Sequence, residues 1–320
     1  MPIRFMQEKD IDLCLTLFNE VIEQQHLPYK HLDKALFASK FLFSNSKLIS
    51  FVYQNDDNIH GFISGSVVHQ KAFITMVMVH SEKQRSKIGS LLLKTFEDTI
   101  LSDYPDVQKI EILFFNPIQL EWIIPNADHH DHPNAPGVDQ SSTAYHFFLH
   151  HGYMPFAKQN SYYKPLKNFE YSTTILDLIS KLHQNNIHIT FYQPHIHDGF
   201  NKLFSDLNNT YWTDEISKAI LHQEPVLIAE KDNQMIGFTG PLKIQPSKRG
   251  YFAGIGVHSA YRGLGIGKVL FASLCMNLFI LGAEYMSLFT GENNPARKIY
   301  ENEQFEIVKS WANMRKEIRK

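Results

Sequence analysis

The residues of this chain best suited to chemistry lie in a segment that occurs twice. Residues 79–90 read VHSEKQRSKIGS and residues 257–268 read VHSAYRGLGIGK, with five identities at the same spacing. Each segment follows a predicted strand and precedes a predicted amphipathic helix. The first amides of a helix have no partners within it, and the helix dipole adds positive charge there. Because glycine lets the backbone approach a phosphate closely, the pattern predicts an anion-binding cradle.

The second copy of this segment has the stronger pattern. Arg262–Lys268 (RGLGIGK) combines three glycines with a cation at each end. Backbone amides in such a loop donate hydrogen bonds to a diphosphate, and the two cations add charge. A glycine-rich turn that merely begins a helix is the simpler alternative, and the flanking strand and helix favour the binding function.

Composition narrows the class of protein. The chain has 320 residues, 43% hydrophobic and 20% charged, which predicts a globular protein long enough for two domains. Its formal net charge of −2 provides no global field for nucleic acid or anionic membranes. Cys14 and Cys275 lie in different halves, so we expect no disulfide and a reducing, cytoplasmic location. The N-terminus does not resemble a signal peptide, and residues 269–281 are too few to span a bilayer, so we expect no membrane partner.

The predicted elements repeat along the chain. Each half reads as a strand, two helices, three antiparallel strands, a helix, a strand, a helix and a strand. We place the domain boundary near residue 167, giving an N-terminal domain over 1–167 and a C-terminal domain over 168–320. Residues 116–140, rich in Pro, Asn, Asp and His, form an insertion in the first domain that packs between the copies or covers the cleft of the first.

This order of elements, together with Arg-x-x-Gly-x-Gly at the start of the third helix, resembles the GNAT superfamily of acetyl-CoA-dependent N-acyltransferases. The resemblance covers nearly the whole chain twice, as in tandem members of that superfamily. It implies an α/β fold of the α+β type. Each copy would be a mixed, mostly antiparallel twisted sheet flanked by helices.

The resemblance implies where coenzyme A binds. The pantetheine arm would pair with the strand at Gly256 and Val257 like an added strand, and the Val257 amide would stabilise the thioester oxyanion. The diphosphate would lie on the loop formed by Arg262, Gly263, Leu264, Gly265, Ile266, Gly267 and Lys268.

A second motif, Asn294-Pro-Ala-Arg-Lys-Ile-Tyr300, resembles the Asn-x-x-Ala-x-x-x-Tyr pattern of this superfamily, with one residue fewer between Asn294 and the alanine. On that likeness Tyr300 is the general acid that protonates the departing thiolate, because a phenol with a pKa near 10 suits that task. Asn294 either hydrogen-bonds the pantetheine amides or caps the helix. Gln304 departs from the family pattern, which has glycine before Phe305, and this changes how the chain leaves the helix.

The first copy of the segment matches the family pattern less well than the second. Lys87 replaces a glycine of the loop, and Phe148, which has no proton to donate, aligns with Tyr300. The first domain is therefore expected to lack this acid and to act either as a second cofactor site or as a scaffold. The residues of that possible second site are Val79, Gln84, Arg85, Lys87, Gly89 and Ser90.

No motif identifies the residues that would contact the acceptor, so the candidates are chosen by their type and position. Glu292 follows the predicted strand 284–290 and is a candidate general base, with a solvated surface charge as the alternative. Tyr211, Trp212 and Glu215, on the second helix of the C-terminal copy, are candidate substrate contacts. The two aromatic rings suit stacking on a sugar, or they simply pack the helix.

Two further types of site are not expected. Residues 128–132 read DHHDH, but ligands from one short loop do not readily close a tetrahedral metal site, so we expect no metal. No Ser-His-Asp or Cys-His arrangement can be assigned, which disfavours a covalent acyl-enzyme.

We therefore expect a cytoplasmic acetyl-CoA-dependent N-acetyltransferase that acts on a small-molecule primary amine, with an amino sugar as the first choice, by direct attack. The alternatives are a non-catalytic acyl-CoA-binding or sensing module and a protein or peptide N-acetyltransferase. The acceptor, the base, the acyl length and the oligomeric state are left open by the sequence.

Overall fold

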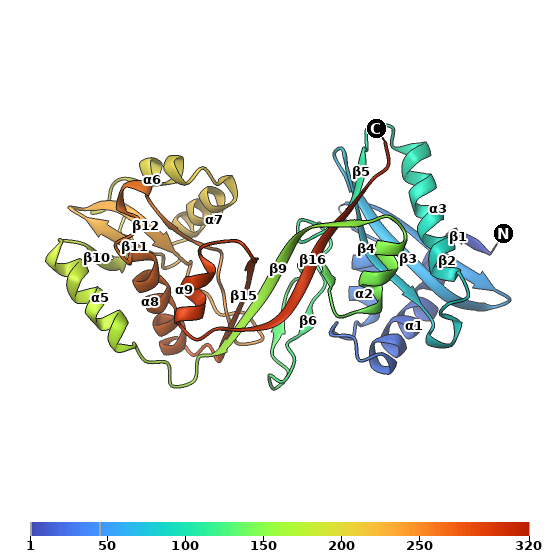
Figure 1. Ribbon diagram of the computed structural model, residues 1–320, viewed down its shortest axis with the longest axis horizontal. Helices are drawn as coiled ribbons and strands as arrows, with labels where there is room; N and C mark the ends of the chain where they lie inside the picture. Colours follow the sequence, from blue (N-terminus) through green and yellow to red (C-terminus); the bar gives the residue numbers. More distant parts are fainter. Residues whose placement is uncertain (1, 45, 320) are drawn as a thin grey trace. The chain divides into compact units, whose positions relative to one another are not determined.

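The computed structural model describes residues 2–44 and 46–319, and the chain divides into two compact units (Figure 1). Unit 1 comprises residues up to 161 together with those from 308 onward, and unit 2 comprises residues 162–307. Each unit combines strands, mostly antiparallel, with flanking helices. This confirms the α/β fold class and the two copies expected from the sequence.

Unit 1 follows the predicted order of elements. Its helices are α1 (Ile11–Gln24), α2 (Lys34–Phe41), α3 (Ile88–Asp103) and α4 (Thr143–His150), with 3-10 turns η1 (Glu8–Asp10) and η2 (Ser81–Lys83). Its main strands are β1 (Ile3–Phe5), β2 (Lys47–Asn55), β3 (Asn58–Val68), β4 (Lys71–Val79) and β5 (Lys109–Ile112). They form a sheet in that order, antiparallel except for β4 with β5. The insertion adds β6 (Trp122–Ile123), β7 (Asp131–His132) and β8 (Val138–Asp139).

Helical periodicity explains how the sheet of unit 1 is covered. Leu92, Phe96 and Ile100 of α3, spaced by four residues, are fully buried as predicted. They belong to one apolar cluster, whereas Phe18 of α1 and Phe37 of α2 belong to another. Both clusters include residues of β2, β3 and β4, so the sheet lies between α3 and the α1–α2 pair.

Unit 2 repeats this plan. Its helices are α5 (Thr173–Gln184), α6 (Phe200–Leu207), α7 (Thr210–Leu221), α8 (Ile266–Ile280) and α9 (Arg297–Asn302), with the 3-10 turn η3 (Ser259–Tyr261). Its strands are β10 (His188–Phe191), β11 (Leu227–Lys231), β12 (Gln234–Thr239), β13 (Arg249–Gly250), β14 (Ile255–Val257) and β15 (Tyr285–Gly291). β10, β11, β12 and β14 form an antiparallel sheet, while β13 pairs with β15 in parallel. The sequence predicts one strand over 251–257, but the structure interrupts it at residues 251–254.

Helix α8 is the most apolar run of the chain and is buried, as predicted. Leu270, Leu274 and Leu278 are fully buried. Helical spacing predicts that Leu281 continues this buried face, and that prediction is wrong. Because α8 ends at Ile280, the Leu281 side chain leaves the buried face and is 55% exposed. Among the described residues, no helix is both long and apolar enough to cross a membrane.

Two long strands contribute residues to both units: β9 (Met154–Pro165) and β16 (Glu306–Glu317). The last strand of the chain completes the sheet of unit 1, where Met314 lies opposite Ile112 of β5. In unit 2 the neighbour of β15 is β9. The sequence places residues 308–320 in the second copy, whereas their strand partners belong to the first. The compact units divide after residue 161 and again after residue 307. The domain boundary near residue 167 stays a prediction.

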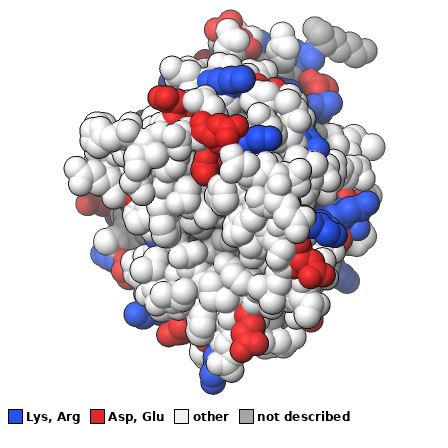
Figure 2. Space-filling view, turned by 90° about the vertical axis from the view of Figure 1, so that its left-hand side faces the viewer, with Lys and Arg blue, Asp and Glu red and all other residues white. Residues whose placement is uncertain are grey.

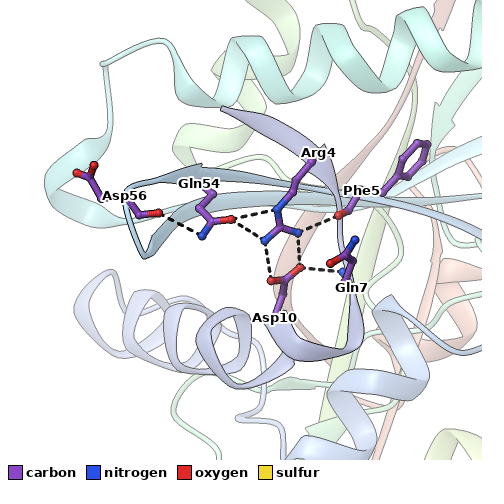
Figure 3. A network of polar contacts seen from close by, with 6 residues as sticks. All are labelled: Arg4, Phe5, Gln7, Asp10, Gln54 and Asp56. Carbon is purple, nitrogen blue, oxygen red and sulfur yellow. Dashed lines mark hydrogen bonds and ion pairs between the residues drawn. The ribbon is translucent and has the colours of Figure 1, made fainter. Parts of the chain in front are cut away.

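A network of charged and polar side chains connects the first elements of unit 1 (Figure 3). The Arg4 guanidinium donates to both carboxylate oxygens of Asp10, over 2.6 and 2.8 Å, and to Gln54 Oε1. Asp10 also accepts from the amide of Gln7. The network therefore joins β1, the start of α1 and β2 through one buried carboxylate.

Charged side chains are interspersed on the face shown in Figure 2, without a broad area of either sign. This matches the near-zero formal charge of the chain. That face provides no continuous basic surface.

Candidate functional site

The site in unit 2 begins where strands β14 and β15 fail to pair. The amide of His258 donates to the carbonyl of Ile236 on β12. Because backbone groups alternate in direction along an antiparallel strand, Gly256 also faces β12 and Val257 faces the opposite edge. On that edge, the Val257 amide has no acceptor among the described residues. The edge can therefore receive an extended chain at Val257, but Gly256 is already paired with β12.

The loop after β14 presents a row of unused amides. Gly263 and Gly265 both have φ +84, in the left-handed region, and Gly265 precedes the first residue of α8. In the described part of the chain, the amides of residues 263–267 have no acceptor. Successive amides in this conformation form an anion-binding concavity at the positive end of a helix dipole.

Close packing explains two of the three glycines. A Cβ on Gly265 would lie 2.8 Å from Leu178, and one on Gly267 would lie 3.1 Å from Ile299. A Cβ on Gly263 would meet nothing within 4 Å, so glycine there serves only the backbone conformation. The cradle therefore depends on helices α5 and α9 as well as on the loop itself.

The two cations of the loop are partly engaged. Arg262 Nε donates to the Val257 carbonyl, and its guanidinium lies 3.9 Å from the Asp206 carboxylate. Burial raises the pKa of the Glu303 carboxyl, and the charges of Lys164 and Lys268 oppose that rise. Arg262 therefore lies over the open strand edge, whereas Lys268 lies towards Glu303.

Tyr300 lies inside the apolar core, beside the interrupted strand. Its ring packs against Phe252 and Phe271, with ring centroids 5.9 and 4.9 Å away. The side chain is only 5% exposed, and its hydroxyl has no hydrogen-bond partner among the described residues. Burial raises the pKa of this phenol, which keeps it protonated at neutral pH.

Asn294 takes part in the turn that precedes α9. Its Oδ1 accepts from the amide of Ala296 over 3.0 Å, and its Nδ2 donates to Thr290 Oγ1 over 2.9 Å. Asn294 therefore shapes the turn before α9 but does not cap the helix, since the N-cap is Ala296 and no side chain caps it. Its other predicted role, contact with the pantetheine amides, stays a prediction.

The candidate base Glu292 lies on the Tyr300 side of the site. Arg297 donates to its carbonyl over 2.8 Å. Burial, the hydrogen bond to Glu301 and, more weakly, the charge of Glu292 raise the pKa of Tyr162 to about 12. Since the ring of Tyr162 lies 5.9 Å from that of Tyr300, both carboxylates belong to the same neighbourhood.

Helix α7 closes the other side of the interrupted strand. Trp212 Nε1 donates to the Ala253 carbonyl over 3.2 Å, and a Cβ on Gly254 would lie 2.2 Å from the same nitrogen. Trp212 therefore packs the helix and is not a free platform for a ligand. The hydroxyl of Tyr251, a residue that the sequence analysis missed, donates to Glu215. No motif marks Tyr251, although it begins the predicted strand.

Unit 1 repeats the loop conformation without the glycines. Arg85 and Lys87 have φ +59 and +70 at the positions of Gly263 and Gly265, so two glycines are replaced rather than one. The amides of residues 85–89 likewise have no acceptor in the described ranges.

The helix after β5 supports the same correspondence. A Cβ on Gly89 would lie 3.3 Å from Phe147, just as one on Gly267 would lie beside Ile299. Phe148 therefore occupies the position of Tyr300, in agreement with the alignment of the two motifs.

The opening between β4 and β5 is bridged in unit 1. Strand pairing ends at Phe73 and Glu111. Beyond that point Asn116 Nδ2 donates to the Ile74 carbonyl over 3.1 Å and to Thr75 Oγ1 over 3.0 Å. A side chain thus spans the gap that in unit 2 is left between β14 and β15.

The insertion packs on the connection between α1 and α2. The amide of Ile123 donates to the Pro28 carbonyl, and Lys30 forms an ion pair with Asp131 over 2.6 Å. His132 stacks on Trp122. Within the described ranges, no group of three or more His, Cys, Asp or Glu side chains could hold a metal ion.

Comparisons with known proteins agree with this geometry. The acetyltransferase (GNAT) family matches residues 15–116 and 190–304, more than half of the chain. Similar solved structures include a GCN5-related N-acetyltransferase from Sphaerobacter thermophilus (TM-score 0.65, 14% identity, covering 99% of this chain and 96% of that one). Another is a tandem GNAT protein from the clavulanic acid biosynthesis pathway (TM-score 0.59, 13% identity, 98% of both chains).

A third similar structure is a GCN5-related glucosamine N-acetyltransferase region of a fungal multi-domain GH3 beta-N-acetylglucosaminidase. Its TM-score is 0.69 at 15% identity over 98% of this chain, which spans 38% of that longer protein. At such identities these likenesses concern the fold. From the two family matches, one in each half, we conclude that the chain belongs to the acetyltransferase (GNAT) family as a tandem member.

Proposed function

We propose that unit 2 transfers an acetyl group from acetyl-CoA to the primary amine of a small molecule. One observation carries this proposal: the unpaired edge of β14 leads directly into a loop whose amides 263–267 have no acceptors. Such an edge suits an amide-containing arm, and such a loop suits a diphosphate. Bound acetyl-CoA supplies an acyl group on a thiol leaving group.

The residues of unit 2 support direct attack by the amine. The Val257 amide, at the open edge, is placed to stabilise negative charge on the thioester oxygen. Cys275 is fully buried, and burial raises the pKa of its thiol, so it does not serve as a nucleophile. Holding the two reactants together then supplies much of the rate enhancement.

Tyr300 is proposed as the general acid. Its phenol is protonated at neutral pH and has no partner in the described part of the chain that would compete for its proton. The contact between its ring and Phe252 of the interrupted strand supports placing this phenol beside the open edge.

An amino sugar is the acceptor class we propose. The exposed ring of Tyr211 on α7 suits stacking on a sugar, whereas Trp212 is used in packing. The name of the glucosamine N-acetyltransferase region among the similar structures is compatible with this choice. We also propose a cytoplasmic location, supported by two cysteines that are free and buried.

Thiol release from acetyl-CoA, measured with the full chain across a panel of amino sugars and other primary amines, tests this proposal. We expect Tyr300→Phe to lower kcat about 100- to 1,000-fold while leaving the Kd for acetyl-CoA within about twofold. Tyr171→Phe, which removes a hydroxyl bonded to Ser273 elsewhere in the unit, is the matched control. Unchanged turnover in Tyr300→Phe would refute the assignment of the acid.

A second candidate function is a non-catalytic acyl-CoA-binding module. The observation that favours it is unit 1, where Phe148 stands in place of the acid and Asn116 bridges the strand opening. Binding of acetyl-CoA without thiol release on any amine would support that alternative.

A further inference from the structure

Three polar side chains of unit 2 meet beside the interruption between β13 and β14. The Tyr251 hydroxyl donates to Glu215 Oε1 over 2.8 Å and also forms a hydrogen bond with Tyr211. Glu215 and Tyr211 lie one turn apart on α7, while Tyr251 begins the interrupted segment. The other carboxylate oxygen, Glu215 Oε2, receives no hydrogen bond from residues 2–44 or 46–319. It is therefore available to a donor that is not part of the chain.

The interrupted segment links this cluster to the proposed acid. Tyr251 contacts α7, whereas the next residue, Phe252, contacts Tyr300 and Phe271. Adjacent residues of extended chain point to opposite faces, as these contacts show. The carboxylate of Glu215 and the phenol of Tyr300 thus approach the same backbone from its two faces.

Helix α7 is held firmly at this point. Trp212 donates to the Ala253 carbonyl, and its indole lies so close to Gly254 that no larger residue fits there. Glu215 is three residues further along the same helix, so its position follows from this anchor. The carboxylate is fixed by tertiary packing rather than left as a mobile surface charge.

We propose that Glu215 binds the ammonium group of the acceptor and takes its proton, and that Tyr251 positions the carboxylate for this task. The inference rests on the acetyl transfer proposed above. It specifies the acceptor class as aliphatic primary amines, which arrive in water as ammonium ions and must lose a proton before they attack.

The proton balance is complete without another reactant. Glu215 accepts one proton from the ammonium group and later releases it to water. The amine nitrogen forms the new C–N bond as the C–S bond breaks, and Tyr300 donates its proton to the departing sulfur. The new amide nitrogen loses its second proton to solvent, from which Tyr300 is reprotonated. One ammonium ion and one thioester therefore yield one amide, one thiol and one proton.

The surroundings of the carboxylate agree with this role. Burial and the hydrogen bonds to Glu215 and Tyr211 raise the pKa of Tyr251, so its hydroxyl remains a donor. Lys243 lies 5.7 Å from the centre of the Tyr251 ring and pairs with Glu224 over 2.7 Å. On α7 itself, the charged neighbours of Glu215 in sequence are Asp214 and Lys218.

The test compares variants of the full chain with aliphatic and aromatic primary amines. With aliphatic amines we expect Glu215→Gln to lower kcat/KM about 100- to 1,000-fold at neutral pH. With aromatic amines, which are neutral there, we expect a loss of less than about tenfold. Calorimetric titration should show the same Kd for acetyl-CoA as in the parent. Asp214→Asn, an exposed carboxylate on the same helix, is the matched control and should behave as the parent does.

Tyr251→Phe provides a second variant with a separate readout. Because the variant removes the hydroxyl that positions the carboxylate, kcat/KM for aliphatic amines should fall about tenfold, while kcat/KM for aromatic amines and the Kd for acetyl-CoA should stay within about twofold. A Glu215→Gln variant with the activity and pH profile of the parent would overturn the inference while leaving acetyl transfer intact. A parent chain that acetylates no amine would instead overturn the proposed function, and this inference with it.

Discussion

The two copies of the repeated segment have the same backbone and different side chains. In unit 2, glycines at 263 and 265 adopt the left-handed conformation, and in unit 1 Arg85 and Lys87 adopt it instead. A non-glycine residue there costs about 1–2 kcal/mol. The surrounding fold therefore imposes the cradle in both units, and glycine only makes it less costly in one of them.

The openings between the strands next to these loops differ more between the two units than the loops do. In unit 1, Asn116 joins the separated strands, and an aromatic ring without a proton stands at the position of the acid. In unit 2, the strand is interrupted, and Tyr300 and Glu215 approach it from opposite faces. The comparison teaches that the copies share the conformation of the loop and differ at the strand opening, where we propose that the acyl group reacts.

Among the changes that test this comparison, the largest effect on cofactor binding is expected from making the second loop resemble the first. Gly265→Lys places a side chain at φ +84, with its Cβ 2.8 Å from Leu178. Strain of about 1–3 kcal/mol corresponds to an affinity for acetyl-CoA that is about 10- to 100-fold weaker, measured by calorimetric titration. The reciprocal change Lys87→Gly, in unit 1, should alter the activity of unit 2 by less than about twofold. Equal effects of both changes would mean that the two loops are functionally equivalent.

The next prediction concerns the stability of unit 1 and follows it separately from that of unit 2. Arg4→Ala leaves the buried Asp10 carboxylate without its cation. Because Arg4 is 30% exposed, we expect a loss of about 2–3 kcal/mol in unfolding free energy, somewhat below that of a fully buried pair. Urea unfolding in a Trp212→Phe background follows unit 1, since the two remaining tryptophans, Trp122 and Trp311, both belong to it.

The same pair predicts a pH dependence. Burial alone would raise the pKa of Asp10, but the hydrogen bonds from Arg4 and the Gln7 amide, with nearby positive charge, lower it below its ordinary value of 3.8. The stabilisation is therefore present above that value and is lost as the pH falls through the lower, folded-state pKa. Arg4→Ala should remove this loss, so a parent and a variant with equal acid sensitivity would contradict the assignment.

A smaller effect is expected from opening unit 1. Asn116→Ala removes the side chain that bridges β4 and β5, while the amides of residues 85–89 remain available. We expect binding of acetyl-CoA to unit 1 to strengthen about tenfold, which corresponds to about 1.4 kcal/mol. The stoichiometry in calorimetric titrations should rise towards two molecules per chain. An unchanged stoichiometry would indicate that Asn116 does not limit access.

The smallest effect is expected from restoring the phenol alone. Phe148→Tyr, added to Tyr300→Phe, should leave thiol release at the level of Tyr300→Phe, because the opening of unit 1 remains bridged. Recovered turnover would show that unit 1 needs only the phenol to be catalytic. It would contradict the inference that the bridged opening keeps unit 1 inactive.

Much of the fold could be predicted because its signals are local. The 3.6-residue period of Leu92, Phe96 and Ile100 predicts a buried helical face, and these residues are buried. The exposure of Leu281 could not be predicted from the same period, because it depends on where α8 ends.

The candidate site could be predicted only in its repeated part. The loop over 262–268 and the tyrosine of the second motif lie where a motif would place them, beside α8 and in α9. Tyr251 and Asn116 carry no motif, since their roles arise from contacts with residues 36 and 42 positions away in the chain.

The repeated segment and the family resemblance were thus sufficient for the class of fold and its repetition, and the glycine pattern was sufficient to locate the loop. The pairing of β16 with β5, the interruption at residues 251–254 and the partners of Glu215 appear only in the folded chain. The physical reason is that the hydrophobic pattern of a segment indicates which face of a helix or strand is buried. It does not indicate which element covers that face, because this depends on packing between residues far apart in the chain. At this site, the covering elements distinguish the two copies at the opening where we propose the reaction.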